Sequence, residues 1–277
     1  VIVEGKYDKL RLECVMEGQI LTTDGFGVFN ARRSARNFSD EEFRAAVSYC
    51  HLRGVKVYLT LNTLVTDREL PALAKEARTA SESGVDAILV QDWGVLSTLQ
   101  KLIPDVPLHA STQMSLHTLS GVNEASILGM TRAVLARELS RKEIAEICAS
   151  SPIEIETFVH GALCMCYSGQ CEMSAVIGRR SGNRGACAQP CRLPYGFSGK
   201  ADGHPLSLKD ANLAPFVPEM MDLGVACLKI EGRMKRPEYV AAVTEIYARL
   251  LREHRGPTKD EQKKLALAFS RDGFTEG

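Results

Sequence analysis

The stretch DEEFRAAVSYCHLRGVKVYLTLN, residues 40–62, decides the fold because it joins a helix directly to a strand. Residues 40–54 carry apolar side chains at helical spacing, with Asp40 as the expected cap and Gly54 as the expected end. The β-branched run 55–62 that follows is typical of a buried strand. A helix that feeds straight into such a strand is half of a βαβ unit, so the stretch predicts an α/β fold.

The same pattern recurs along the chain. Eight segments are predicted as strands, most of them beginning on Val, Ile or Leu and ending on polar residues: 1–5, 19–23, 55–62, 86–92, 107–111, 131–139, 153–161 and 225–233. Segments of helical spacing separate them, and a long amphipathic helix over 236–254 follows the last. Eight such repeats predict a parallel (β/α)8 TIM-like barrel. An open doubly wound sheet gives the same alternation, although no GxGxxG loop follows the first strand.

Composition narrows the class of protein. The chain has 277 residues, 45% hydrophobic and 25% charged, with a formal net charge of zero. No apolar run approaches the roughly 20 residues that span a bilayer, and the opening residues lack a secretory signal. We therefore expect a cytoplasmic protein with no membrane partner, whose nine cysteines are thiols or metal ligands rather than disulfides.

Five cysteines fall in CMCYSGQCEMSAVIGRRSGNRGACAQPC, residues 164–191. This Cys-rich excursion leaves the seventh predicted strand at its far end, which would place the thiols at the mouth of the barrel, where such barrels carry their active sites. Residues 173–201 contain no acidic residue but five cations, which suits a phosphate or small anion as well as it suits a solvated loop: Arg179, Arg180, Arg184, Arg192 and Lys200.

Several chemistries compete for these thiols. Disulfides are disfavoured by the reducing compartment, and zinc by the absence of a CxxC pair. A nucleophilic Cys164 would need a base, for which His160 is the nearest candidate in sequence. Iron–sulfur ligation tolerates irregular spacing, so one [4Fe–4S] centre would suit four of the five: Cys164, Cys171, Cys187 and Cys191.

The run ETFVHGALCMCYSGQCEMS, residues 156–174, resembles the signature of the peptidase U32 family. The resemblance extends over roughly 26–277, through HASTQMSLH (109–117), VLARELS (134–140), NRGACAQPCRLPY (183–195), SLKD (207–210) and LKIEGRMKRPEYV (228–240). It implies a barrel domain over 31–255 with a Cys-rich insert at 161–200. Residues 256–277 would then begin a truncated C-terminal extension.

The resemblance also implies an activity. Family members were first named collagenase-like peptidases, and better-understood ones are similar to tRNA or rRNA hydroxylases that form 5-hydroxyuridine or 5-hydroxycytidine, with prephenate implicated. We therefore expect an RNA pyrimidine hydroxylase, with a thiol peptidase or a non-catalytic RNA-binding protein as the alternatives. The oligomeric state stays open.

Residue roles follow from the same comparison and from the polar ends of the predicted strands. Cys164, Cys171, Cys187 and Cys191 would hold the cluster, with Cys227 as an alternative fourth ligand and Cys166 as a spare thiol. The expected catalytic residues are His160, Glu231, Arg233 and Glu138. The expected substrate-binding residues are Arg137, Gln113, Arg179, Arg180 and Arg184.

The first thirty residues resemble a different family. VIVEGKYDKLRLECVMEGQILTTDGFGVFN is similar to the opening of a Toprim domain of the ribonuclease M5 type, without its later Asp-x-Asp element. Both openings are β-α-β in pattern. We expect the Toprim-like segment 1–30 to stand in for the first unit of the barrel.

Overall fold

Helix α2 (Asp40–His51) and strand β3 (Lys56–Leu61) form where the sequence predicts them. The computed structural model describes residues 2–5, 20–23, 29, 38–196, 203–232, 235–270 and 273–276. The cap of α2 is Ser39 and not Asp40. Its hydroxyl accepts from the Glu42 amide at 3.2 Å, while the Glu42 carboxylate accepts from the Ser39 amide at 2.9 Å. This reciprocal capping box needs Glu three residues after the cap, which Ser39 has.

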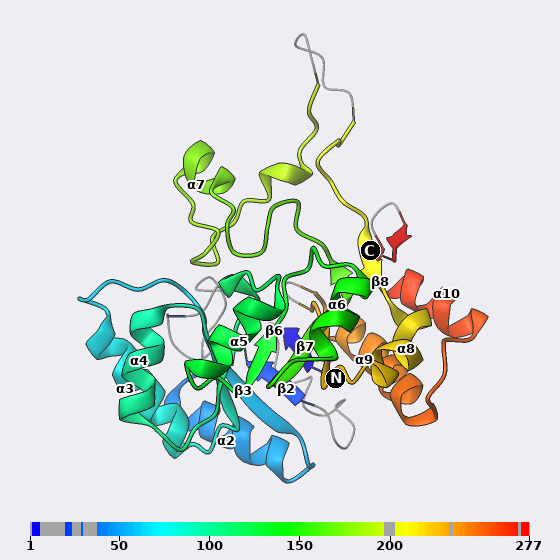
Figure 1. Ribbon diagram of the computed structural model, residues 1–277. Coiled ribbons are helices and arrows are strands. Elements are labelled where there is room, and N and C mark those ends of the chain that lie inside the picture. Colours follow the sequence, from blue (N-terminus) through cyan, green and yellow to red (C-terminus); the bar gives the residue numbers. More distant parts are fainter. Residues whose placement is uncertain are drawn as a thin grey trace.

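Eight parallel strands form a ring, so the predicted barrel is confirmed (Figure 1). The pairings run from the first strand to the seventh in chain order. The seventh then pairs with β9, and β9 pairs with β1. The strands are β1 (Ile2–Gly5), β2 (Ile20–Thr23), β3, β4 (Ala87–Val90), β5 (Leu108–Ala110), β6 (Arg132–Val134), β7 (Glu154–Ala162) and β9 (Cys227–Ile230).

Helices cover the outside of this ring, as parallel crossovers require. They are α2, α3 (Leu70–Glu82), α4 (Trp93–Leu102), α5 (Leu119–Ile127), α6 (Arg141–Cys148), α8 (Val217–Asp222) and α9 (Pro237–Glu253). A first apolar cluster lies between strands and the helices from α2 to α6. A second joins α8 and α9 to the seventh and ninth strands and to α10 (Lys259–Ala268). The partly buried Val225 packs against both clusters.

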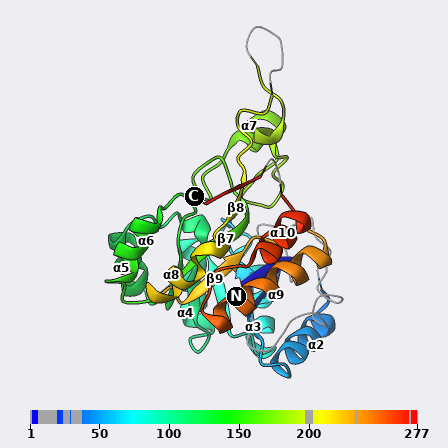
Figure 2. The same ribbon diagram turned by 90° about the vertical axis from the view of Figure 1, so that its right-hand side faces the viewer.

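Two further strands lie outside the ring and were not predicted. β8 (Asp210–Asn212) pairs antiparallel with the end of β7, and β10 (Phe274–Thr275) pairs with β8. Between β7 and β8 the chain forms the insert, which contains α7 (Met173–Gly178) and the 3-10 turn η3 (Pro190–Arg192). A further 3-10 turn, η4 (Ala214–Phe216), follows β8. Both views show α7 beyond one end of the barrel (Figures 1 and 2).

Charged side chains fill part of the barrel interior. Glu156 of β7 is fully buried, and its carboxylate lies 3.1 Å from the Lys229 ammonium and 3.4 Å from the Arg132 guanidinium. The Arg132 guanidinium also lies 2.6 Å from the carboxylate of Glu154, the first residue of β7. Burial raises the pKa of Tyr58, which packs under Arg132, to about 12. The interior is therefore held by ion pairs as well as by apolar packing.

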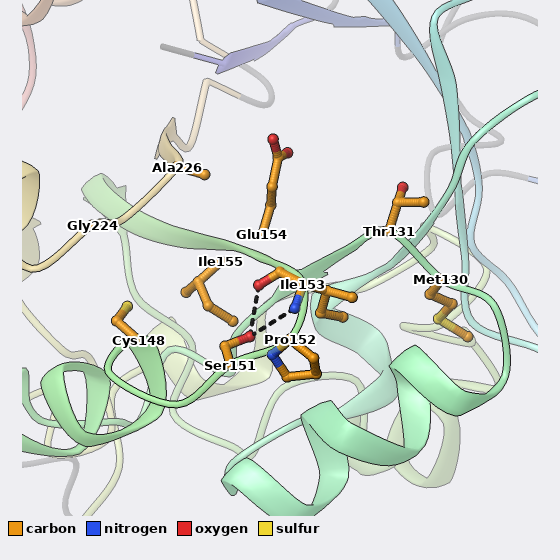
Figure 3. Close-up of a pocket in the computed structure, with 10 residues that line it drawn as sticks. All are labelled: Met130, Thr131, Cys148, Ser151, Pro152, Ile153, Glu154, Ile155, Gly224 and Ala226. Atoms are coloured by element: carbon orange, nitrogen blue, oxygen red, sulfur yellow. Dashed lines mark hydrogen bonds between the residues drawn. The ribbon is translucent and has the colours of Figure 1, made fainter.

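The end of the barrel opposite the insert carries a shallow hollow of about 520 Å³ (Figure 3). Its wall comes from the residues that lead into three ring strands, including Met130, Ile153 and Gly224. Ser151 closes one side through hydrogen bonds with both backbone groups of Ile153. Since these are the amino ends of the strands, the hollow lies away from the mouth. In the part of the chain that is described, no helix is long and apolar enough to cross a membrane.

Replacing the buried carboxylate tests the interior network. Glu156→Gln removes the charge that both Arg132 and Lys229 face, and breaking a buried ion pair costs roughly 3–5 kcal/mol. We expect the free energy of unfolding, measured by urea titration, to fall by about that amount. Glu146→Gln, in an exposed pair with Lys142, is the control and should change it by less than about 0.5 kcal/mol. An unchanged midpoint for Glu156→Gln would show that the network contributes nothing.

Candidate functional site at the barrel mouth

Polar side chains line the carboxyl ends of the ring strands. Asn62 donates to the Ser111 hydroxyl at 3.1 Å, which joins the ends of the third and fifth strands. Gln91, after β4, donates to the Gln113 carbonyl at 3.2 Å, where the turn η2 (Thr112–Met114) begins to leave the sheet. The mouth is therefore a connected set of amides and hydroxyls rather than separate side chains.

Asn183 holds the insert against this set. Its side-chain amide donates to Gln91 Oε1 at 2.7 Å and to Gln113 Oε1 at 2.9 Å, and its oxygen accepts from the Leu64 amide at 3.0 Å. One residue of the insert thus reaches the ends of three strands. The predicted substrate-binding residue Gln113 is one of its partners.

Arg184 adds a second attachment. Its guanidinium makes a two-pronged contact with the Glu69 carboxylate, at 2.6 and 2.9 Å. These hydrogen bonds, together with those from Thr66, lower the pKa of Glu69 to about 2. Arg184 was predicted to bind substrate, and in the structure its guanidinium pairs with the Glu69 carboxylate.

A third attachment is the loop that follows Cys166. The buried Ser168 hydroxyl donates to Glu138 Oε1 at 3.0 Å and accepts from the Arg137 amide at 3.3 Å, and its carbonyl accepts from the Ser115 hydroxyl. The other Glu138 oxygen lies 3.1 Å from His117 Nε2. Glu138, predicted to be catalytic, thus holds this loop through one oxygen and contacts His117 through the other.

Arg137 and Glu231 form a buried ion pair at the mouth. The guanidinium lies 3.2 Å from the carboxylate, and about 10% and 5% of the two side chains are exposed. Phe158 lies 4.0 Å beneath the guanidinium, and the Ala162 carbonyl accepts from its Nη1. Among the described residues, the buried Arg137 Nε has no hydrogen-bond partner. The pair therefore presents a desolvated cation with unused donor capacity.

The four predicted ligand cysteines gather in the insert. Burial raises the pKa of the Cys191 thiol, Arg192 lowers it, and the nearby Cys164, Cys187 and Cys171 raise it further. Cys191 therefore lies within electrostatic range of the other three thiols, and all four are free. No three metal-binding side chains of the described residues stand at coordination distance. Four thiols on one loop system nevertheless fit a cation or cluster by their donor chemistry.

The two remaining cysteines of interest occupy different places. Burial raises the pKa of the Cys166 thiol, and the neighbouring Cys171 and Cys164 raise it further. Cys227 begins β9, at the end of the barrel opposite the mouth, and burial raises its pKa to about 12. The structure therefore does not bring Cys227 to the insert thiols.

His160 lies in an aromatic cluster on the barrel wall. A register shift in β7 separates it from Phe158, and its ring packs against Tyr239 and Tyr247 of α9 and Phe274 of β10. Its Nδ1 lies 3.2 Å from the Tyr247 hydroxyl. Burial lowers its pKa to about 4, although Asp210 acts in the other direction. The ring is thus an imidazole with a lowered pKa that is packed among aromatic side chains.

The other cationic side chains named from the sequence lie in different environments. Arg179 and Arg180 are exposed at the end of α7, and Arg180 Nε donates to the Ala186 carbonyl within the insert. Arg192 binds the Leu163 and Leu208 carbonyls and so clamps the base of the insert. Arg233 and Lys200 lie outside the described residues.

Sequence reasoning missed Asn183 and Glu69. An Asn in a polar loop carries no signal of its own, and Glu69 is separated from Arg184 by 115 positions. Only the folded chain brings these groups together.

The chain is similar in sequence to proteins of a known family. Residues 23–277 match the model of peptidase family U32. A relative from Escherichia coli K12, "23S rRNA 5-hydroxycytidine C2501 synthase", is 39% identical over 86% of this chain and 37% of its own length. The "tRNA hydroxylation protein P1" of Bacillus subtilis 168 is 34% identical over 89% of this chain and 61% of its own. This chain thus spans between a third and two thirds of the length of these two relatives.

Other matches carry different names. A "Collagenase" from Porphyromonas gingivalis W83 is 33% identical over 99% of this chain and 71% of its own length. The solved structure of the U32 peptidase Mk0906 superposes with a TM-score of 0.55 at 15% identity, over 83% of this chain and 91% of the other. The latter likeness supports the fold alone.

Asn183→Asp tests the attachment of the insert. A carboxylate there faces two amide oxygens without a donor, and leaving such groups unsatisfied costs roughly 1–3 kcal/mol. We expect amide hydrogen exchange over residues 181–192 to accelerate several-fold, read by mass spectrometry. Arg179→Gln is the control, since this exposed side chain forms no hydrogen bond or ion pair among the described residues. Equal exchange in the two variants would contradict the assigned role of Asn183.

His160→Phe tests the buried imidazole. The ordinary pKa of 6.5 falls to about 4 in the folded protein, so between these values the unfolded chain binds a proton that the folded chain excludes. Stability is therefore full above pH 6.5 and is lost as the pH falls toward 4. We expect the free energy of unfolding of the variant, measured by urea titration, to depend less steeply on pH in this range. The slope should fall by up to roughly 1 kcal/mol per pH unit. Identical slopes would mean that folding does not lower the pKa of His160.

Proposed function

Since the chain belongs to peptidase family U32, we propose that it hydroxylates a pyrimidine base in tRNA or rRNA. We assign a [4Fe–4S] cluster to Cys164, Cys171, Cys187 and Cys191. The observation that carries the proposal is the gathering of these four free thiols in an insert docked over the barrel mouth. The names of the Escherichia coli and Bacillus subtilis relatives support RNA as the substrate class.

The donor set suits this assignment. A [4Fe–4S] centre takes four thiolates and supplies one-electron transfer when bound. Hydroxylation exchanges a ring C–H for C–OH and removes two electrons, so the site must admit an electron acceptor and an oxygen donor beside the base. The mouth, rather than the hollow at the other end, is where the thiols and the polar strand ends meet.

Arg137 is the residue that we assign to an anionic group of the substrates. Its guanidinium is buried, oriented by Glu231 and Phe158, and keeps Nε without a partner among the described residues. A cation in such a place binds a carboxylate or phosphate more strongly than one in water. We propose a carboxylate co-substrate such as prephenate for this position. Glu231 orients Arg137, and Glu138 acts as a positioning residue for the loop that carries the thiols.

Exposed Arg179 and Arg180 are assigned to the RNA backbone. They stand on the insert, within the acid-free run 173–201, and neither forms an ion pair among the described side chains. Arg184 is assigned to docking of the insert, because its two-pronged contact with Glu69 joins the insert to a segment 115 positions away in the chain. Backbone contacts of this kind make affinity depend on salt but not on sequence.

A thiol peptidase is the rival that the "Collagenase" relative raises. It would need Cys164 beside His160 as its base. Within the described part of the chain, His160 Nε2 has no hydrogen-bond partner, and Nδ1 faces Tyr247. Ser168 and His117 likewise both face Glu138, so no serine–histidine pair forms there. The arrangement favours hydroxylation.

Anaerobic purification with iron and sulfide quantified per chain tests the cluster. We expect about four of each in the wild type, and a loss of most of both in Cys187→Ser. Cys148→Ser, on helix α6, is the matched control and should keep full iron. Cys166→Ser should also keep it if that thiol is a spare. A colourless wild-type protein that hydroxylates RNA would overturn the cluster assignment.

Activity is then read as hydroxylated pyrimidine nucleosides, by mass spectrometry of RNA incubated with the reconstituted protein. Arg137→Lys keeps the charge but loses the planar set of donors, and we expect its turnover to fall at least roughly tenfold. Cleavage of a peptide substrate that thiol alkylation blocks, without any RNA product, would support the peptidase instead. RNA binding without turnover would support a non-catalytic role.

A further inference from the structure

We propose that Tyr167 is the stacking platform for the target base of a single-stranded RNA. This inference rests on the proposed RNA function and names the residue that would position the base. Tyr167 lies between Cys166 and Cys171, and about 64% of it is exposed. It is therefore a large aromatic ring in solvent, in the loop that carries the thiols.

The ring is held in a defined orientation. The His117 imidazole meets it in an edge-to-face contact, with ring centroids 5.5 Å apart and an angle of 80°. His117 is itself fixed, because Nδ1 lies 2.6 Å from the Ser115 carbonyl oxygen and Nε2 lies 3.1 Å from Glu138. An edge-to-face contact of this kind supports the tyrosine and leaves most of its surface open.

The backbone that carries the ring is equally constrained. The next residue, Ser168, is 4% exposed and is bound by Glu138, Arg137 and Ser115. Gly169 follows with φ +78°, and a Cβ there would stand 2.6 Å from the Gln113 carbonyl. Only glycine fits such a conformation and such an approach. A rigid loop thus presents an exposed aromatic side chain at the mouth.

A single exposed tyrosine is ordinary on a protein surface. Tyr167 differs because buried polar groups fix its loop, so the ring is preorganised and loses little entropy when it binds a planar ligand. Proteins that recognise single-stranded RNA stack unpaired bases on such rings and hold the backbone with cations. Arg179 and Arg180 supply exposed cations on the same insert.

The geometry points to an unpaired base and not to a duplex. A base inside a helix has both faces covered by its neighbours, so a tyrosine can stack on it only after it leaves the stack. Stacking is also tolerant of sequence, because every base has a π-face. Tyr167 would therefore position the base, while discrimination between bases would come from other groups at the mouth.

Binding of a fluorescein-labelled oligouridylate to the iron-loaded protein, read by anisotropy, tests the assignment. Tyr167→Leu removes the ring at similar size, and we expect Kd to rise roughly 5- to 100-fold, the range seen for loss of one stacked base. Tyr167→Phe keeps the ring and should bind within about twofold of the wild type. Val176→Ala, an exposed apolar residue of α7 in the same insert, is the control and should not change Kd.

The outcomes separate this inference from the proposed function. If the wild type binds the oligonucleotide and Tyr167→Leu binds equally well, the stacking role is overturned and the RNA function stands. If the wild type binds no RNA, both are overturned. Should Tyr167→Leu lose iron or fold poorly, photo-crosslinking of a 4-thiouridine oligonucleotide to the wild type decides. A crosslink at Tyr167 is expected, and crosslinks confined to other segments contradict the proposal.

Discussion

Strand β7 is the constraint on which the rest of the structure depends. It pairs with β6 along its first residues, with β9 along its middle, and with β8 along its last three. The pairing with β9 closes the ring. The pairing with β8 lies outside the ring, at the point where the insert leaves the barrel. A register shift between Phe158 and His160 lets one strand serve both purposes. Such an irregularity re-aims the side chains that follow it.

That shift accounts for the contrast between the two residues on either side of it. Phe158 stays inside the barrel, where it supports the Arg137 guanidinium, whereas His160 packs on the wall against α9. The mouth therefore keeps a buried cation, and the imidazole becomes part of the apolar packing. The insert is then attached to the mouth by polar contacts from Asn183, Ser168 and Arg184, while apolar side chains of the insert such as Val176 and Ile177 stay exposed.

The extent to which the sequence predicts this architecture depends on the range of the interactions involved. Helices and ring strands follow from local periodicity. β3 lies within one residue of its expected bounds at each end, whereas α2 begins at the expected residue and ends three residues before the expected Gly54. The short β8 and β10 escape prediction, since three-residue and two-residue strands have no periodicity to detect. The cap of α2 is displaced by one residue because Ser39 and Glu42 satisfy each other, and Asp40 has no such partner.

At the site, the sequence by itself determined which chemical groups are present and at which end of the barrel they are expected. Four thiols on one loop, a basic stretch without acids, and polar residues at strand ends could all be read from the chain, because each is a property of composition and spacing. Only the tertiary structure decided which of those residues remain available. Arg184 pairs with Glu69, Glu138 holds the loop of Ser168, and Cys227 lies at the far end of the barrel. These outcomes depend on contacts between segments tens of residues apart, and such partners are chosen by the closure of the barrel rather than by neighbours in sequence.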